Sequence, residues 1–245
     1  MELAIKVIVA LAGVVVMGVL GLTVALMKLV MSMANGDVRI EPLDEGELPK
    51  MLSDCAEHIE QGEVMGFAVE EVYRVSLAKM PPLDTVVLSN PNRCDFFAVT
   101  RTAKGDLKPS FSSVREVRHT PGRVSVDTHS DSSEKILPKP PDTFGQAFEG
   151  LSVAELHERH AEGVRHLESQ VPTTREPLPI GLAAMLRQGV MFDAKYVMRR
   201  PLWILRLPYW TLIRKRQLVN RPIADRWPAG HPRFAQAAAT PRVYS

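Results

Sequence analysis

Cysteine is scarce in this sequence, which has only Cys55 and Cys94 among 245 residues. Two cysteines cannot form a disulfide framework or a four-cysteine zinc site, although one long-range disulfide remains possible. Neither cysteine belongs to a C-x-x-C pair or lies in a cluster with histidine. We therefore interpret both as free thiols of a protein in a reducing compartment.

The common catalytic and cofactor-binding motifs are also missing. The sequence has no G-x-S-x-G, no Walker-type glycine loop, no G-x-G-x-x-G and no C-x-x-C-H haem attachment. We expect no catalytic residue and no cofactor. The alternative is a membrane-anchored enzyme acting on a small or lipid substrate, with Cys94, His157 and His160 as its candidate residues.

The densest group of titratable residues is LHERHAEGVRH, which begins at Leu156. His157 and His160 are three residues apart and therefore lie near one another on a helix surface. Such a pair can begin a metal site, but the spacing is not H-E-x-x-H and the sequence assigns no third ligand. The competing interpretation, which we prefer, is a charged helix face with His160 packed at its edge and no metal.

Charge is the first feature present in excess. From Arg187 to Ser245 the sequence has twelve Lys/Arg and two acids, a balance of +10, whereas the other 186 residues carry 18 basic and 26 acidic groups, a balance of −8. Such asymmetry indicates an anionic partner for the basic end. A solvated basic tail is the alternative.

A long uncharged run, VIVALAGVVVMGVLGLTVALM, extends from Val7 to Met27. As a helix its 21 residues measure roughly 30 Å, the thickness of the hydrocarbon layer of a bilayer. The run is longer than the apolar region of a signal peptide, although SMA at 32–34 resembles a cleavage site. The sequence predicts a single transmembrane anchor over residues 1–33. Gly18, Gly21 and Ala25 are its candidate residues for close packing with another helix.

Positive residues after the anchor set the expected orientation. Lys28, Arg39 and Lys50 follow the apolar run, whereas Lys6 precedes it. By the positive-inside rule, the short N-terminus is outside and the bulk of the chain is in the cytoplasm. The expected location is thus the bacterial inner membrane.

The chain after the anchor is predicted to be an α+β protein. Residues 34–45 have the composition of a linker, and residues 46–171 form a small domain with four or five antiparallel strands between Met65 and Thr128. The strands SSVREV and RVSVD flank a Pro-Gly turn and predict a hairpin. Ser152 and Glu155 form a capping box at the start of a helix, and a second helix covers 180–200. Residues 172–219 are assigned to a helical basic extension and 220–245 to an extended Pro-rich tail.

The stretch RRPLWILRLPYWTLIRKR, Arg199–Arg216, combines basic, aromatic and aliphatic residues without an acid. We call it the basic–aromatic segment. It is too short to span a bilayer, and Pro208 is a candidate first residue of a helix. Trp, Tyr and Arg suit both a surface of anionic lipid headgroups and a protein interface, so both partners stay open. A surface that stacks nucleic-acid bases would not expose this many aliphatic side chains, so nucleic acid is not an expected partner. The candidate contact residues are Arg199, Arg200, Trp203, Arg206, Tyr209, Trp210, Arg214, Lys215 and Arg216.

The block from Ser110 to Leu167 resembles an uncharacterised type of bacterial single-pass membrane protein. The resemblance rests on SFSSVREV…GRVSVDT, the Pro-rich stretch after it and the helix with LHERH. It implies a membrane-anchored α+β domain and no activity. We expect a non-catalytic accessory or scaffold subunit whose partners are integral membrane subunits, with respiratory or photosynthetic complexes as candidate hosts. A lipid-surface organiser is the remaining alternative.

Overall fold

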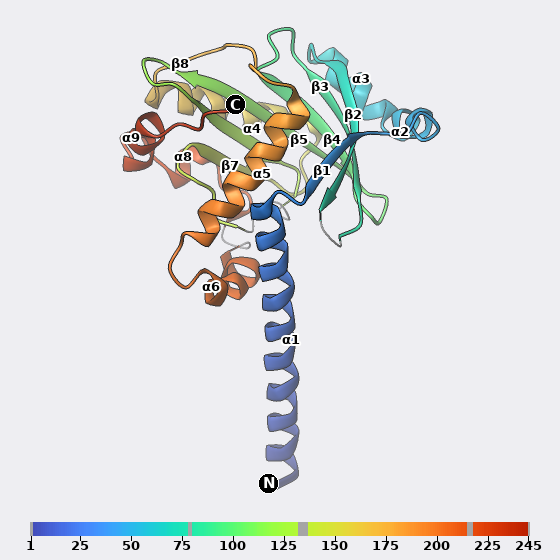
Figure 1. The fold of residues 1–245 in the computed structure, drawn as a ribbon, viewed down its shortest axis with the longest axis vertical. Coiled ribbons are helices and arrows are strands. Elements are labelled where there is room, and N and C mark those ends of the chain that lie inside the picture. Colours follow the sequence, from blue (N-terminus) through green and yellow to red (C-terminus); the bar gives the residue numbers. More distant parts are fainter. Residues whose placement is uncertain (1, 78–79, 132–136, 215–217, 245) are drawn as a thin grey trace.

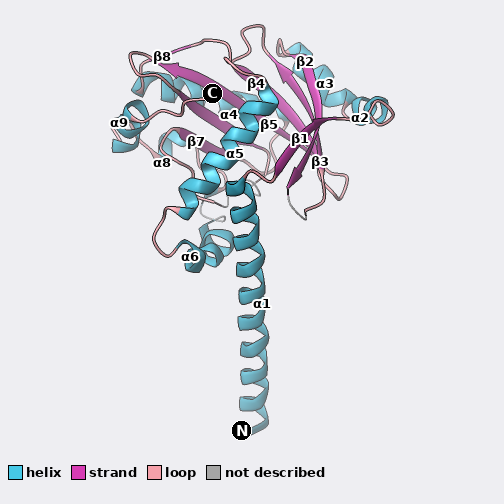
Figure 2. Cartoon of the chain, viewed as in Figure 1, coloured by secondary structure: helices cyan, strands magenta, loops and turns pink. Residues whose placement is uncertain are grey.

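The computed structural model describes residues 2–77, 80–131, 137–214 and 218–244. One eight-stranded sheet with helices on both faces forms the domain, and one long helix projects from it (Figures 1 and 2). The α+β class predicted from the sequence is confirmed. The strands are β1 (Val38–Pro42), β2 (Ala68–Leu77), β3 (Leu83–Ser89), β4 (Asp95–Arg101), β5 (Leu107–Val117), β6 (Arg123–His129), β7 (Thr143–Ala147) and β8 (Thr173–Thr174).

The strands follow one another across the sheet in the order of the sequence. Neighbours from β1 to β6 are antiparallel, as in a meander, and β7 pairs with β6 in parallel. β8 pairs with the end of β5. The predicted hairpin is confirmed as β5–β6, in which Ser113 is opposite Val126. β1 was missed because the polar composition of residues 34–45 is typical of a linker, whereas the strand forms by backbone pairing with β2.

The helices differ greatly in length. They are α1 (Glu2–Asn35), α2 (Leu48–Asp54), α3 (Ala56–Val64), α4 (Val153–Gln170), α5 (Leu182–Met198), α6 (Trp203–Tyr209), the π-helical turn η2 (Trp210–Arg214), α8 (Ile223–Arg226) and α9 (Pro232–Ala239). Residues 48–64 form two helices, α2 and α3, because the chain is not helical at Cys55. α4 and α5 match the two helices predicted after residue 150.

Alternation along each strand divides the core into two faces. On β5, Phe111 and Val117 contribute to the face covered by α2, α3 and α4, whereas Val114 faces α5. Figure 1 shows α5 crossing the near face of the sheet and α4 behind it. The Phe97 and Phe111 rings stack at 4.6 Å between centroids at the centre of the α4 side.

The C-terminal residues are part of the core. Ile223, Phe234 and Ala237 are buried with Phe144 and Leu167 in the cluster between α4, β6 and β7. The prediction of an extended tail over 220–245 was therefore wrong. The two short apolar stripes of α8 and α9 were hidden in the sequence by the prolines between them, and only the sheet supplies the surface against which they pack.

α1 is joined to the domain by its last turns. Val30 and Ala34 of α1 pack against Ala194 and Val197 of α5 and against α6. The remainder of the helix extends away from the domain, with the N-terminus at its far end (Figure 1). Pro208 lies inside α6 near its end and is not the first residue of a helix. Its missing backbone N–H fits the change to a π-helical turn at Trp210.

The capping box of α4 gives a stability prediction. The Ser152 hydroxyl accepts a hydrogen bond from the Glu155 backbone N–H, and the Glu155 carboxylate accepts one from the Ser152 backbone N–H at 2.8 Å. We expect Ser152→Ala to lower the free energy of unfolding by about 1 kcal/mol because the Glu155 backbone N–H loses its side-chain acceptor. Denaturation of the full chain in mild detergent measures it. Ser53→Ala, at an exposed position on α2, is the control; an equal loss there would contradict the prediction.

Candidate functional site

The basic–aromatic segment folds as α6 and η2 against the base of α1. Leu207 is fully buried and Trp210 is 6% exposed, and both contact the cluster that contains Val30 and Ala34 of α1. Figure 1 shows α6 beside α1, at the point where α1 leaves the domain. The end of α1 and the segment therefore form one surface, which we call the base of the domain.

The predicted contact residues have different environments in the structure. Trp210 is buried in the interior and Trp203 is half-buried beside it, so neither is fully available to a partner. Arg214 is half-buried, and the Arg200 guanidinium binds the hydroxyl of Tyr196 and lies over its ring. Lys215 and Arg216 are outside the described residues. The exposed candidates are Arg199, Arg200, Arg206 and Tyr209.

Aliphatic side chains stand among these basic residues on the outside of the base. Leu202 is 67% and Leu205 is 72% exposed, and about half of the Leu212 and Ile213 surface is accessible. Several large apolar side chains open to water in one short segment indicate a surface that contacts something apolar. With Arg199 and Arg206 exposed beside them, the segment has the composition of an element at a membrane interface.

α1 supplies a second apolar surface. Met17–Asn35 is long and apolar enough to cross a membrane, and 11% of this stretch is buried in the structure. Cβ atoms added at Gly18 and Gly21 would meet nothing within 4 Å, and Ala25 is exposed. Thus no described residue of this chain packs on the small-residue face of α1, and helix packing at these three residues stays a prediction.

His160 is enclosed by hydrogen bonds on the α4 side of the sheet. Its Nε2 is 2.8 Å from the Ser113 hydroxyl and its Nδ1 is 2.9 Å from the Thr128 hydroxyl. Gln146 donates to the same Thr128 hydroxyl and accepts from the backbone N–H of Ile223. Burial lowers the pKa of His160 to about 3, so the ring is neutral near pH 7. The histidine therefore links α4, two strands and the C-terminal residues.

Cys94 and His157 lie near this network in different surroundings. The Cys94 thiol is buried, and burial raises its pKa, which disfavours the reactive thiolate. The His157 ring packs against Phe67 and Phe111, and burial lowers its pKa. Within the described residues no group of three or more His, Cys, Asp and Glu side chains could hold a metal ion.

A charged network continues along the same face of the sheet. The buried Arg115 guanidinium lies 2.8 Å from an Asp95 oxygen and 2.7 Å from a Glu168 oxygen. It also donates to the backbone carbonyl of Cys94. Arg115 thereby joins β4, β5 and α4, and a buried guanidinium tolerates this position only because two carboxylates compensate its charge.

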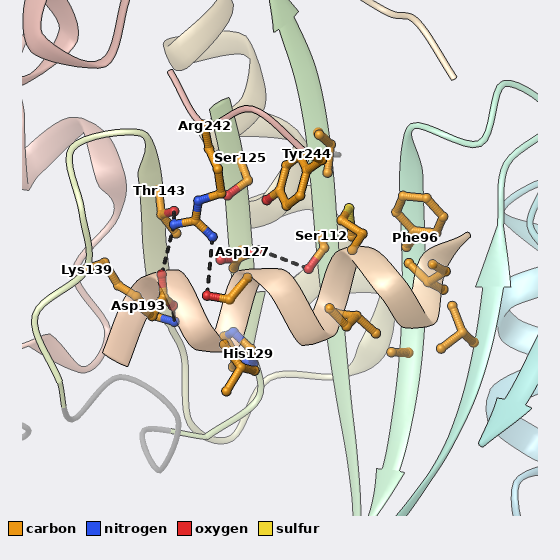
Figure 3. Close-up of a pocket in the computed structure, with 18 of the residues that line it drawn as sticks. Phe96, Ser112, Ser125, Asp127, His129, Lys139, Thr143, Asp193, Arg242 and Tyr244 are labelled. Atoms are coloured by element: carbon orange, nitrogen blue, oxygen red, sulfur yellow. Dashed lines mark hydrogen bonds and ion pairs between the residues drawn. The ribbon is translucent and has the colours of Figure 1, made fainter. Parts of the chain in front are cut away.

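A cavity of about 220 Å³ lies on the opposite face, between α5 and the sheet (Figure 3). Leu182, Met185 and Phe96 form an apolar end. At the other end, Arg242 bonds to Asp142 and to Asp193, and Lys139 also pairs with Asp193. The cavity is large enough for a small apolar molecule. No motif could reveal it, because the Arg242 and Asp142 side chains meet across a separation of 100 residues.

No family model, curated protein or solved structure matches the chain. The resemblance to single-pass bacterial membrane proteins therefore stays a prediction. The base of the domain, with its exposed apolar and basic side chains and the adjoining helix α1, is the strongest candidate for a functional surface.

His160 makes stability depend on pH. In the unfolded chain its pKa returns to the ordinary value of 6.5, whereas in the folded protein it is about 3. Below pH 6.5 the unfolded state thus binds a proton that the folded state does not. The free energy of unfolding therefore decreases as the pH is lowered, by up to about 1.4 kcal/mol per pH unit. We expect His160→Gln to reduce this slope between pH 6.5 and 5.

Urea denaturation of the full chain in detergent at several pH values measures the slope. His157, whose pKa burial also lowers, leaves a smaller residual slope in the variant. His119→Gln, at an exposed position, is the matched control and should keep the wild-type slope. A His160→Gln protein with an unchanged slope would contradict the assignment of a neutral, enclosed histidine.

Proposed function

We propose that this chain is a non-catalytic accessory or scaffold subunit of a bacterial membrane complex. α1 anchors it in the inner membrane, and the base of the domain docks on the membrane surface. The observation that carries the proposal is that α1 leaves the domain beside α6 (Figure 1), and that α6 and η2 carry exposed apolar residues.

Two features favour a retained anchor. A core helix of a soluble protein would be mostly buried, whereas 11% of the candidate span of α1 is buried. A cleaved signal sequence would take Val30 and Ala34 away and leave Ala194 and Leu207 of the domain without their neighbours. Removal of such contacts from a packed core costs several kcal/mol, so the domain depends on the end of α1.

The position of α6 and η2 fits an element lying on the bilayer. Leu26 and Met27 of α1 pack at the edge of the same cluster as Trp203, so the segment is level with the end of the apolar run. Leu205, Leu212 and Ile213 can then enter the boundary between headgroups and acyl chains, while Arg199 and Arg206 remain near lipid phosphates. Attachment at two places fixes the domain against the membrane and concentrates it there for a partner.

The partner in this proposal is an integral membrane subunit. The face of α1 that carries Gly18, Gly21 and Ala25 lacks neighbours among the described residues of this chain. Helices approach one another closely in membranes at such small residues. With the cytoplasmic orientation expected from the positive residues, the domain lies on the side with the anionic leaflet.

Labelling of single introduced cysteines tests the contact with the membrane. Cys55 and Cys94 are buried, so Leu205→Cys or Val64→Cys provides the only exposed thiol among the described residues. In inverted membrane vesicles we expect an impermeant maleimide to label Val64→Cys on α3 and to label Leu205→Cys about tenfold more slowly, because lipid covers position 205. Similar rates at the two positions would contradict the membrane contact. Labelling of Val64→Cys in intact spheroplasts instead would contradict the orientation.

Co-purification tests the partner. We expect the full chain, extracted from native membranes in mild detergent, to migrate with a large complex. Gly21→Leu should reduce the bound fraction about tenfold, equivalent to roughly 1.4 kcal/mol, because the helices can no longer approach. Leu20→Met, at an exposed position on a different face of α1 from Gly21, is the control and should bind normally. Migration of the wild-type chain as a lone monomer would refute the accessory-subunit proposal.

A further inference from the structure

Three guanidinium groups meet at a small cavity near the base of the domain. Its walls come from the end of η2, from β7 and from α8 and α9, and its volume is about 30 Å³. We call it the arginine cavity. By the criterion that a water needs about 10–15 Å³, it has room for about two oxygen-sized atoms. The lining residues are Leu137, Lys139, Gly145, Arg214, Leu218, Arg226, Trp227 and Arg233.

Two of the arginines are held firmly. Arg226 donates from Nη1 to the carbonyl of Gly145 at 2.5 Å, and Arg233 donates from Nη2 to the carbonyl of Thr143 at 2.9 Å. Both guanidinium groups also lie over the Trp227 ring, at 4.2 and 4.6 Å from its centroid. These contacts fix where the remaining N–H donors point, so the groups are preorganised for a ligand.

Their positive charge is not compensated by the rest of the described chain. Within the described residues no carboxylate lies within 4.0 Å of Arg214, Arg226 or Arg233, and the buried Nε of Arg233 has no acceptor. The carboxylate of Asp142 acts on Arg233 through space, but it is bonded to Arg242. Lys139 adds a further positive group, which is paired with Asp193.

The electrostatic effect of this grouping is visible on the arginines themselves. Burial lowers the pKa of Arg226 to about 10, and repulsion from Arg214, Arg233 and Arg221 adds to the effect. Burial also lowers the pKa of Arg233 to about 10, with repulsion from Arg214 as a further contribution. Buried cations without an anion are costly, and a bound anion would remove most of that cost.

We propose that the arginine cavity binds a phosphate group. Planar guanidinium forks match the oxygens of a phosphate, and the small cavity admits such oxygens but not a bulky ligand. Arg214 is the last residue of η2, so the cavity adjoins the surface that we assign to the membrane. A phospholipid headgroup and a free phosphate share this chemistry. The lipid form rests on the proposed membrane contact, whereas phosphate binding itself does not.

Thermal unfolding of the full chain in non-ionic detergent tests the site without a membrane. We use inorganic phosphate and a soluble short-chain phosphatidic acid, with sodium chloride at equal ionic strength as reference. At about 100 times its dissociation constant, either ligand should raise the unfolding temperature by about 5 °C. Arg214→Gln removes a guanidinium for which no hydrogen bond within the described chain is known, so the fold should survive and this rise should be lost.

Arg39→Gln is the matched control, since Arg39 is exposed on β1, at the opposite edge of the sheet from β7, and loses the same charge. It should keep the wild-type response. A rise with both ligands supports a site for the phosphate group alone, and a rise only with phosphatidic acid supports a headgroup site. Equal responses of the wild type and Arg214→Gln, or no response beyond that to chloride, would overturn the site. Because this assay contains no bilayer, its result is independent of the maleimide labelling of Leu205→Cys.

Discussion

The packing of the last turns of α1 against α5 and α6 is the interaction on which the functional surface depends. Ala34 and Ala194 are small enough to let the helices approach closely, and Val30, Val197 and Leu207 fill the space around them. The contact sets the direction in which α1 leaves the domain. It also holds α6 beside α1, so one cluster positions both α1 and the apolar side chains of the base.

α5 connects this cluster to the rest of the domain. One side of the helix gives Ala194 and Val197 to the contact with α1, and the other gives Leu182 and Met185 to the sheet. Asp193, between these two sides, pairs with Arg242 near the C-terminus. A displacement of α1 is thus transmitted to the sheet through α5, which packs on both sides, and through β1, which follows α1 directly in the chain. This arrangement suits a subunit that must hold its domain in a fixed position.

The sheet itself is tied together by polar groups that the packing cannot replace. Arg115 and His160 are buried side chains that each have polar partners on two other elements, and loss of any partner would leave a polar group without compensation. Such a network specifies the position of α4 on the sheet more sharply than apolar contacts do. The histidine thus fixes the structure around it from a buried position, whereas the sequence had suggested a place at the edge of a charged helix face.

The features that could be predicted from the sequence are those whose residues lie close together along the chain. The apolar run of α1, the β5–β6 hairpin and the capping box at Ser152 are local patterns, and each was readable. The pairing of β1 with β2 depends on strand partners, and the burial of Ile223 and Phe234 depends on a groove built by other elements. The arginine cavity joins Gly145 to Arg226 across 81 residues, a meeting that no spacing rule encodes. Within the candidate site, the sequence indicated the composition of the base but not that Trp210 is part of the core.

The charge asymmetry of the C-terminal quarter gains a different meaning from the fold. Counted along the sequence, twelve basic residues against two acids indicated an anionic partner for the whole basic end. In the structure Arg242 is neutralised by Asp142 and Asp193 inside the domain, so it adds nothing to an external field. Arg206 is exposed at the base, whereas Arg226 and Arg233 are half-buried around Trp227. The excess charge is therefore divided between an open surface, where salt screens it, and a cavity, where screening is weak and a single anion has a large effect.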